Sequence, residues 1–256
     1  MDTMDTMEQY LRAVELLPNA IDNPGEYPWC LPAVRGLGRL ALHPRCTFLV
    51  GENGSGKSTL LEAIAVAWGF NPEGGSINFN FATRETHSPL HRALKLTRGV
   101  RRPRDGYFLR AESLYNVATN MDELDEDPGY GPPIVQSYGG VSLHRQSHGE
   151  AFLSLVLHRF GGQGLYLLDE PEAALSPMRQ MALLRRMDEL IGTRSQFIIA
   201  THSPLLLAYP DACIYSLDGG PHPVAYRDTD HYRVTRAFLE HPEGILRQLL
   251  GEDEEE

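Results

Sequence analysis

The apolar positions of this chain cluster into short runs that predict buried β-strands. Three runs have the length and the bounding residues of strands covered on both faces, and they lie at residues 46–50, 165–168 and 196–200. A fourth apolar run at 107–110 predicts another strand, and residues 76–81 alternate polar and apolar side chains as a half-buried strand does.

Longer segments with helical apolar spacing lie between these runs. They cover residues 59–70, 150–160 and 177–191. Ser176 and Pro177 are the residue types preferred at the N-cap and at the first position of the third helix. Strands that alternate with helices indicate an α/β fold, with a mostly parallel central sheet and helices on both faces.

Both ends of the chain add further elements to this pattern. Residues 31–50 predict an N-terminal β region that leads into the first buried strand. Residues 212–218 and 223–226 flank Gly219 and Gly220, which predicts a terminal hairpin. Residues 231–250 have a helical pattern.

The length of 256 residues predicts a single domain over residues 1–256. We expect residues 1–25 to form an N-terminal extension, residues 82–150 a small inserted helical lobe, and residues 251–256 a solvated acidic tail. The extension is repetitive and contains three candidate start residues, Met1, Met4 and Met7.

The formal net charge of −11 argues against a protein that coats nucleic acid, because such a protein needs a basic face. A nucleic-acid partner is therefore not favoured. One stretch is nevertheless basic, and it is either a docking surface for an anionic partner or an ordinary solvated loop. Its members are Arg92, Lys95, Arg98, Arg101, Arg102, Arg104 and Arg110.

The composition predicts a cytoplasmic protein without membrane insertion. No apolar run approaches the length of about 18 residues that a membrane span needs, and no charged and then apolar leader is present. Cys30, Cys46 and Cys213 are an odd number without C-x-x-C spacing, so we expect reduced, packed cysteines instead of a disulfide framework.

The most specific motif is a glycine-rich loop between the first buried strand and the first long helix. Residues 51–58 read G-E-N-G-S-G-K-S and match the P-loop pattern G-x-x-x-x-G-K-[ST]. Its glycines let backbone N–H groups turn toward a phosphate, and the helix N-terminus adds a positive dipole end. Lys57 would reach the β- and γ-phosphates of ATP, and the Ser58 hydroxyl would bind Mg²⁺. The residues expected to bind the nucleotide here are Gly51, Glu52, Asn53, Gly54, Ser55, Gly56, Lys57, Ser58 and Thr59.

A second motif separates ATPases from other P-loop proteins. Residues 165–170 read L-Y-L-L-D-E, an apolar strand that ends in two acids, which is the Walker B pattern. Asp169 would hold Mg²⁺ through its water shell. Glu170 would orient or deprotonate the attacking water, which makes it the candidate catalytic base.

A third segment, S-H-G-E at residues 147–150, precedes a helix and lies between these two motifs. At this point the chain resembles the ABC-type ATPases, whose signature is commonly L-S-G-G-Q. Ser147 and Gly149 match the signature, whereas His148 replaces its first glycine and Glu150 its glutamine. The resemblance implies that Ser147 and Gly149 contact the γ-phosphate of an ATP held by a second copy, in a head-to-tail homodimer that encloses two ATP molecules.

The same resemblance assigns two further segments. His202, in A-T-H-S-P after the strand at 196–200, corresponds to the switch histidine that contacts the γ-phosphate and links it to the attacking water. Residues 171–177 correspond to the D-loop, where Ser176 replaces the aspartate that is usual in transporters.

Two parts of the family pattern match less well. The Q-loop region at residues 108–113 contains no glutamine, so Glu112 or Arg110 would substitute for it. Tyr27 and Trp29 are candidates for stacking on adenine, and a core role is an equal alternative for Trp29.

His87 and His91 have the i,i+4 spacing of metal ligands. A zinc site needs at least three protein ligands, and no third one is evident near this pair. We therefore expect these two histidines to be structural.

The pattern D-E-P-E-A-A-L-S-P, with Ser203 and Pro204 after the histidine, resembles the soluble SMC, RecF and OLD branch more than transporter cassettes. The segment between Ser58 and Ser147 is too short for a long coiled coil. The resemblance therefore implies a bare ATPase head, similar to small stand-alone bacterial ATPases.

Three functions remain open. The first is a soluble, Mg²⁺-dependent ATP hydrolase whose dimer acts on an unidentified protein partner, in DNA repair or defence. The alternative is the nucleotide-binding subunit of an ABC transporter. The third is a switch that binds ATP without hydrolysis, which Glu170 argues against.

Overall fold

The computed structural model describes residues 9–21, 23–77, 88–111, 114, 119 and 143–251. Within these ranges the chain forms a seven-stranded sheet in the order β10-β9-β3-β8-β7-β6-β4. The neighbours from β9 to β6 pair in parallel, and the two edge strands pair antiparallel. The predicted α/β fold with a mostly parallel sheet is confirmed. The strands are β3 (Cys46–Val50), β4 (Gly75–Ser76), β6 (Asp105–Arg110), β7 (Gly164–Asp169), β8 (Gln196–Ala200), β9 (Cys213–Ser216) and β10 (His222–Pro223).

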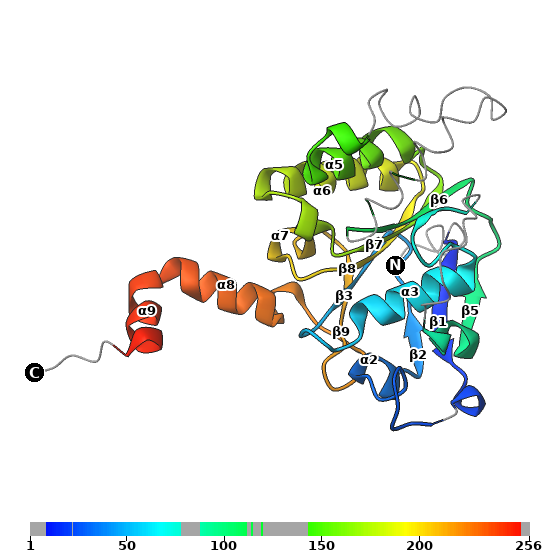
Figure 1. Cartoon of the computed structure of the whole chain (residues 1–256), viewed down its shortest axis with the longest axis horizontal. Coiled ribbons are helices and arrows are strands. Elements are labelled where there is room, and N and C mark those ends of the chain that lie inside the picture. The colour runs from blue at the N-terminus through cyan, green and yellow to red at the C-terminus, as the bar shows by residue number, and fades with distance from the viewer. Residues whose placement is uncertain are drawn as a thin grey trace, which may run out of the picture.

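Helices cover both faces of this sheet, as expected (Figure 1). One face carries α3 (Lys57–Trp68) together with a second sheet in the order β2-β1-β5. The other face carries α5 (His148–Arg159), α6 (Pro177–Gly192) and α7 (Pro204–Leu207). The second sheet consists of β1 (Leu11–Leu16), β2 (Arg39–Ala41) and β5 (Leu94–Arg98). The short helices are α2 (Pro32–Arg35) and the 3-10 turns η1 (Pro18–Ala20), η2 (Pro89–Ala93), η4 (Leu143–Arg145), η5 (Pro171–Ala174) and η6 (Tyr226–Asp228).

Strand β7 shows how the apolar pattern builds the core. Leu165 and Leu167 pack with α3, whereas Tyr166 and Leu168 pack with α5 and α6, because successive side chains of a strand point to opposite faces. Both layers are fully buried, and each buried Leu contributes about 1.5–3 kcal/mol through the hydrophobic effect. This double burial explains why the run reads as continuously apolar.

Strand β1 lies inside the segment that we expected to be an N-terminal extension. It is the middle strand of the second sheet, and its backbone is joined to β8 through the buried side chain of Gln196. The amide oxygen of Gln196 accepts hydrogen bonds from the N–H groups of Tyr10 (3.1 Å) and Leu11 (2.9 Å), and its nitrogen donates to the carbonyls of Leu11 and His43. The N-terminal extension expected at residues 1–25 therefore contains a strand of the second sheet.

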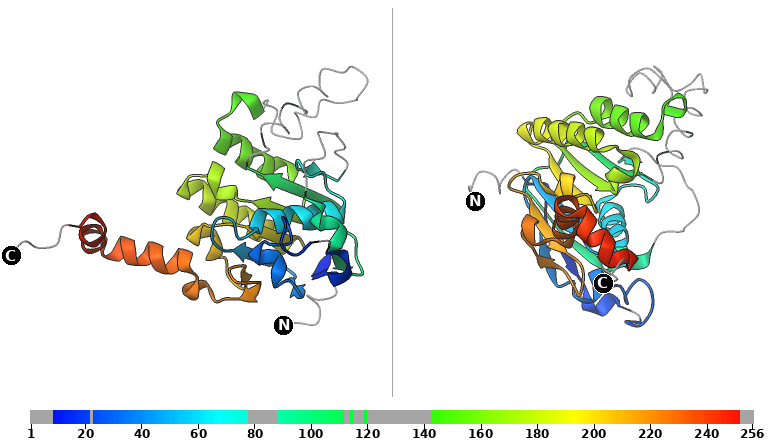
Figure 2. Two further views of the ribbon diagram at one scale, coloured as in Figure 1. Left: turned by 60° about the horizontal axis from the view of Figure 1, so that its bottom comes forward. Right: turned by 90° about the vertical axis from the view of Figure 1, so that its left-hand side faces the viewer.

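The C-terminal helices extend away from the body of the molecule (Figure 2). The predicted helix at 231–250 is confirmed as two helices, α8 (Asp230–Glu240) and α9 (Pro242–Leu250), which meet at His241. No helix in the described ranges is long and apolar enough to cross a membrane.

Two smaller sequence expectations concern the start of α6 and the strand at residues 76–81. Ser176 stands at the N-cap of α6, as expected from its position. Its side chain, however, makes no capping hydrogen bond to the helix. The strand expected at 76–81 is described only as far as Ile77, and the rest of it lies outside the described residues.

Candidate functional site

The strand order brings the predicted motifs to one edge of the sheet. Strand β3 lies beside β8, and β8 lies beside β7, with all three parallel. The loops after β3 and β8 hold the P-loop and His202, and β7 ends at Asp169 with Glu170 directly after it. Ligands of parallel α/β sheets bind at this edge because such loops converge there.

The P-loop wraps around the side chain of Lys57. This lysine is 4% exposed, and its Nζ donates to the carbonyl oxygens of Gly51 (2.8 Å) and Glu52 (3.1 Å). Burial lowers the pKa of Lys57, and the nearby carboxylates, Glu170 foremost among them, oppose this effect only in part. The ammonium group thus points at the loop centre, where the motif would place phosphates.

Two neighbouring segments hold the P-loop in shape. Gly56 has φ +97°, and a Cβ there would lie 3.1–3.2 Å from the side chains of Leu31 and Ala33 at helix α2. The Ala33 N–H also donates to the Ser55 carbonyl (2.9 Å). On the other side, Asp218 after β9 accepts a hydrogen bond from the Glu52 N–H (2.9 Å).

Asp169 lies at the tip of β7 and is 5% exposed. Its carboxylate Oδ2 is 3.4 Å from Arg110 Nε, and the Arg110 guanidinium also donates to Glu62 on α3 (2.7 Å). Arg110 pairs in register with Asp169 across the β6–β7 ladder. Of the two Q-loop candidates, Arg110 therefore lies at the site, whereas Glu112 is outside the described residues.

Glu170 follows in the left-handed region, with φ +48° and ψ +53°. This conformation is strained for a residue with a side chain, and such residues are concentrated at functional sites. The Glu170 carboxylate is half-exposed, and its Oε1 is 3.7 Å from Nε2 of His202. The separation is too long for a direct hydrogen bond, but it brings the two candidate catalytic side chains together.

His202 is held by two groups to which the sequence analysis assigned no role. The carboxylate of Glu172 accepts hydrogen bonds from the His202 N–H and from the Thr201 hydroxyl (2.8 Å). The His202 Nδ1 lies 2.9 Å from Nε2 of His231, at the start of α8. Burial lowers the pKa of both histidines, and the charge of Lys57 lowers them further.

The signature segment is a capping box at the start of α5. The Ser147 hydroxyl accepts from the Glu150 N–H, while the Glu150 carboxylate accepts from the Ser147 N–H (3.0 Å) and hydroxyl (2.7 Å). Arg179 on α6 also pairs with Glu150 (3.0 Å). Hydrogen bonds from Ser147 hold the pKa of Glu150 below its ordinary value. Gly149 is required by packing, since a Cβ there would lie 2.5 Å from the Ala174 carbonyl.

The structure does not bring the signature to the P-loop of the same chain. A cavity of about 270 Å³ lies over the P-loop, and neither Ser147 nor Gly149 lines it. The described hydrogen bonds of the Ser147 side chain go to Glu150 and Arg179. The lining residues of this cavity are Tyr27, Leu31, Asn53, Gly54, Gly56, Lys57, Ser58, Thr59 and Glu170.

The two aromatic candidates for adenine stacking are separated by their burial. Tyr27 is 61% exposed and lines the cavity over the P-loop. Trp29 is 6% exposed and packs in the core on the α3 face. The core alternative that the sequence left open for Trp29 is the one observed.

The oxygen ligands at this edge suit Mg²⁺. Asp169 supplies a buried carboxylate, and Ser58 supplies a hydroxyl in the first turn of α3, on the cavity wall. Mg²⁺ prefers few protein oxygens together with water and substrate phosphates. No group of three or more His, Cys, Asp or Glu side chains forms a metal cluster among the residues that the structure describes, and His87 lies outside them.

Comparisons with known proteins point the same way as the geometry. Residues 140–208 match the family described as "AAA domain, putative AbiEii toxin, Type IV TA system", and residues 37–101 match a family described as "AAA domain". Together these matches include the P-loop, the signature, the acid pair and His202.

Two curated relatives come from Rhodopseudomonas palustris, strains BisB5 and HaA2, and both are the cytochrome c biogenesis ATP-binding export protein CcmA. The first is 31% identical over 192 residues, which covers 68% of this chain and 86% of the relative. The second is 30% identical over 177 residues, which covers 61% and 78%, respectively.

A solved structure with the same fold is an inward-facing conformation of "a putative metal-chelate type ABC transporter". It superimposes with a TM-score of 0.51 at 16% identity, and covers 89% of this chain and 88% of that one. At this identity the likeness concerns the fold alone.

Proposed function

Because the chain belongs to the ABC-type P-loop ATPases and is an ATP hydrolase of that type, we propose that it hydrolyses ATP at the carboxyl edge of β3, β8 and β7. The observation that carries this proposal is the convergence of four side chains from three segments, one at the carboxyl end of each of these strands. Lys57, Asp169, Glu170 and His202 meet around the P-loop, although up to 145 positions separate them along the sequence (from 57 to 202).

Each of these side chains has a proposed role in charge stabilisation. On ATP binding, the Lys57 ammonium group leaves the carbonyl oxygens of Gly51 and Glu52 and donates to the β- and γ-phosphates instead. Glu170 orients the attacking water and accepts its proton, and His202 links that water to the γ-phosphate. Glu172 acts as a positioning residue, because it fixes the backbone of His202.

Ser58 and Asp169 would hold Mg²⁺, which neutralises charge on the phosphates when it is bound. Arg110 keeps the Asp169 carboxylate in place from the neighbouring strand. Tyr27 is the proposed adenine contact, since it is the exposed aromatic residue on the cavity wall.

One chain supplies only part of the expected ATP site, which supports a dimer as the active form. Ser147 and Gly149 lie at the N-terminus of the twelve-residue helix α5, and neither lines the P-loop cavity. A helix N-terminus stabilises phosphate charge. We therefore propose that two copies bind head to tail, so that the signature of each completes the ATP site of the other.

The central test replaces Glu170 with Gln. Hydrolysis is expected to fall by about 100-fold or more, because the general base is lost. The same variant should accumulate as an ATP-bound dimer, measured by size-exclusion chromatography with light scattering in saturating ATP.

Two further variants make this test specific. The matched control Glu189→Gln, on the exposed surface of α6, should hydrolyse ATP at the wild-type rate. Adding Ser147→Ala to Glu170→Gln should return the protein to monomer. A Glu170→Gln protein that stays monomeric in saturating ATP would contradict the sandwich arrangement.

Two candidate functions remain, and they differ in the partner protein that each requires. The first is a stand-alone ATPase that acts on a partner protein in defence or DNA repair, and the match of residues 140–208 to a family described as a putative toxin of a "Type IV TA system" supports the role in defence. The export protein named for the curated relatives supports a transporter subunit. Pull-down with the Glu170→Gln variant distinguishes them, since a transporter subunit should retain a protein with several membrane spans.

A further inference from the structure

The contact between His202 and His231 joins the candidate ATP site to the C-terminal helix α8. Nδ1 of His202 and Nε2 of His231 are 2.9 Å apart, which is hydrogen-bond distance. The ring centroids are 5.1 Å apart and the ring planes are inclined by 53°, so the rings meet through these two nitrogens and do not stack. Since an imidazole nitrogen donates only when it carries a proton, this contact requires one proton between the two rings.

The other ring nitrogen of His202 faces the candidate catalytic carboxylate. Nε2 of His202 is buried and lies 3.7 Å from Oε1 of Glu170, and it has no hydrogen-bond partner among the residues that the structure describes. A buried polar atom without a partner at a functional site indicates a group that a ligand or water completes. In the proposed ATPase, that partner is the γ-phosphate or the attacking water.

The two neutral forms of His202 differ in what they present at this position. With the proton on Nδ1, Nε2 directs a lone pair at carboxylate and phosphate oxygens, which are themselves acceptors. With the proton on Nε2, the ring donates toward those oxygens, and Nδ1 becomes an acceptor that needs a donor. Burial lowers the pKa of both histidines, so both rings are neutral near neutral pH. The second form is therefore the one that suits a contact with the γ-phosphate.

The start of α8 holds His231 in place. Its buried N-cap residue, Thr229, donates to the carbonyl of Tyr226 (2.7 Å), and the Tyr226 hydroxyl donates to the carbonyl of Pro204 (3.0 Å). Pro204 lies two residues after His202, so the turn before α8 is tied to the loop that carries His202. Side chains that are held by such surrounding contacts keep the geometry of a site precise.

We propose that His231 is a positioning residue whose Nε2–H donates to Nδ1 of His202 and thereby keeps the proton of His202 on Nε2, directed at the γ-phosphate. The hydrogen bond made by one imidazole nitrogen sets the protonation of the other. This role rests on the proposed ATP hydrolysis, because it concerns the orientation of His202 in that reaction. It predicts an effect on the rate of hydrolysis and little effect on ATP affinity.

The first measurement locates the proton of His202 in the full-length protein without nucleotide. Nitrogen-15 NMR above neutral pH distinguishes protonated from bare ring nitrogens in histidine-labelled protein, and a His202→Asn spectrum identifies the signals of His202. We expect the proton on Nε2 in wild type and a loss of this preference in His231→Leu, which removes the donor. The same proton position in both proteins would overturn the proposal.

The second measurement is steady-state ATP hydrolysis with Mg²⁺. His231→Leu should lower kcat about tenfold and leave KM within about twofold of wild type, because one hydrogen bond that supports the transition state is lost. His231→Gln should restore kcat to within about threefold, since its amide nitrogen lies as far along the side chain as Nε2 and donates without titrating. A Gln variant as slow as the Leu variant would contradict a role as donor.

A double variant and a control exclude general damage. In a His202→Ala background, His231→Leu should lower kcat no further, because His231 acts only through His202. A further tenfold loss in that background would refute this pathway. His158→Leu, at an exposed histidine on α5, is the matched control and should keep the wild-type kcat. If His231→Leu does not fold, His231→Asn replaces it, since its shorter amide does not reach Nδ1 of His202.

The proposed function and the role of His231 fail in different ways. A wild-type protein that does not hydrolyse ATP, or a His202→Ala variant as fast as wild type, would refute the proposed role of His202, while NMR would still decide whether His231 sets its proton position. An active enzyme that depends on His202 and is not slowed by His231→Leu would overturn the role of His231 alone.

Discussion

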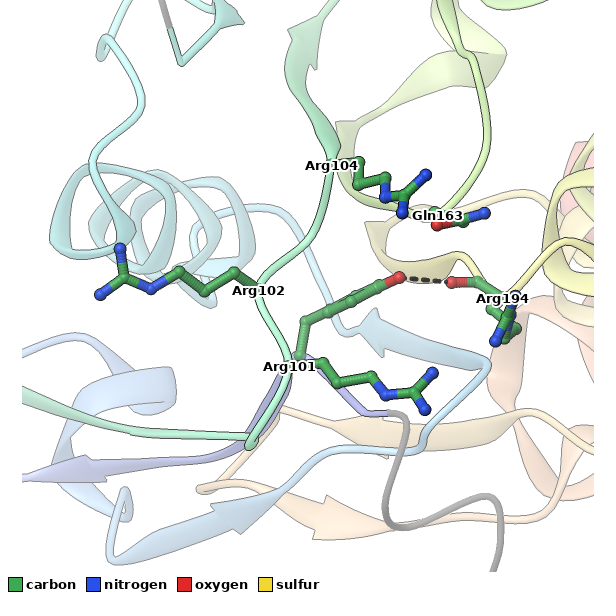
Figure 3. A pocket seen from close by; sticks show the side chains of 6 residues that line it. Arg101, Arg102, Arg104, Gln163 and Arg194 are labelled. Atoms are coloured by element: carbon green, nitrogen blue, oxygen red, sulfur yellow. Dashed lines mark hydrogen bonds between the residues drawn. The ribbon is translucent and has the colours of Figure 1, made fainter.

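The two edges of the central sheet are built in contrasting ways. At the carboxyl edge, the candidate ATP site is formed largely by short continuous motifs, each of which follows one strand. At the amino edge, a cavity of about 520 Å³ (Figure 3) is lined, among the described residues, by residues from four segments of the chain. They are Tyr10, Arg101, Arg102, Arg104, Gln163 and Arg194. The same parallel strands position the ATP site and this cavity, but only the ATP site is visible as a pattern in the sequence.

The two edges differ in how far the local sequence encodes them. A phosphate cradle needs several consecutive backbone N–H groups, and consecutive groups require consecutive residues, as in the loop at 51–58. A cavity lined by guanidinium groups needs only side chains that reach a common space, and long side chains from distant segments can do so. The basic stretch noted in the sequence supplied three arginines to this cavity, and Arg194 came from elsewhere.

The largest expected effect at one edge alone comes from Lys57→Ala. ATP affinity should fall by more than about 100-fold, because Lys57 makes charge-assisted contacts to two phosphates worth about 3–5 kcal/mol together. Calorimetry with ATP measures this loss. The Arg101→Gln, Arg104→Gln variant, at the amino edge, should bind ATP at the P-loop as wild type does, and a comparable loss there would show that ATP binding does not depend on the carboxyl edge alone.

A smaller effect is expected from Gln196→Ala, which tests how the amino edge is assembled. The Gln196 side chain joins β8 to the backbone around Tyr10 and Leu11, and its removal leaves two buried N–H groups without that acceptor. The free energy of unfolding should drop by about 2–3 kcal/mol, measured by urea denaturation.

The exposed surface substitution Arg185→Ala serves as the control for Gln196→Ala and should change stability by less than about 0.5 kcal/mol. A Gln196→Ala protein as stable as this control would mean that the second sheet is held by its apolar contacts alone.

The smallest expected effect is a pH dependence confined to the carboxyl edge. Burial lowers the pKa values of His202 and His231 below 6.5 in the folded protein. At His231 the neighbouring His202 lowers the pKa further, and the charge of Lys57 does so at both rings. Glu170 opposes the effect at His202, and Glu52 and Asp218 oppose it at both rings. Between the folded pKa and 6.5 the unfolded chain binds more protons, so stability is complete above pH 6.5 and is lost as pH falls through the folded pKa.

Unfolding free energy should therefore decline below about pH 6.5 in wild type and decline less steeply in His231→Asn. Urea denaturation at several pH values measures the slope. His158→Asn, an exposed histidine on α5, is the control and should leave the wild-type slope unchanged. Identical slopes for wild type and His231→Asn would contradict a lowered pKa of His231 in the folded protein.

Much of the fold followed from local patterns. The strand at 46–50 was placed at its observed bounds, and the helices at 150–160 and 177–191 were placed to within about two residues, because their apolar spacing is regular. Strand β1 escaped prediction, since it lies beyond a repetitive acidic start and its position depends on pairing with β2 and β5.

The residues of the candidate ATP site were likewise predicted only in part. Lys57, Asp169, Glu170 and His202 were expected, and the structure brings them together. Glu172, His231 and Asp218 were not assigned a role, although Glu172 lies within the D-E-P-E segment and was the one with a sequence signal. Nothing local marks His231 or Asp218, because each acts through a contact with a residue far away in the sequence.

Local residue types and their spacing were enough to predict the family, the ATP hydrolase activity and the candidate nucleotide residues, because phosphate chemistry requires fixed residue types at fixed spacing. The tertiary structure alone decided which side chains support them, that Trp29 packs in the core while Tyr27 lines the cavity over the P-loop, and that four arginines line the cavity at the amino edge. Those outcomes depend on the order of strands in the sheet, because this order sets which loops are neighbours at each edge. Local residue spacing does not predict the strand order.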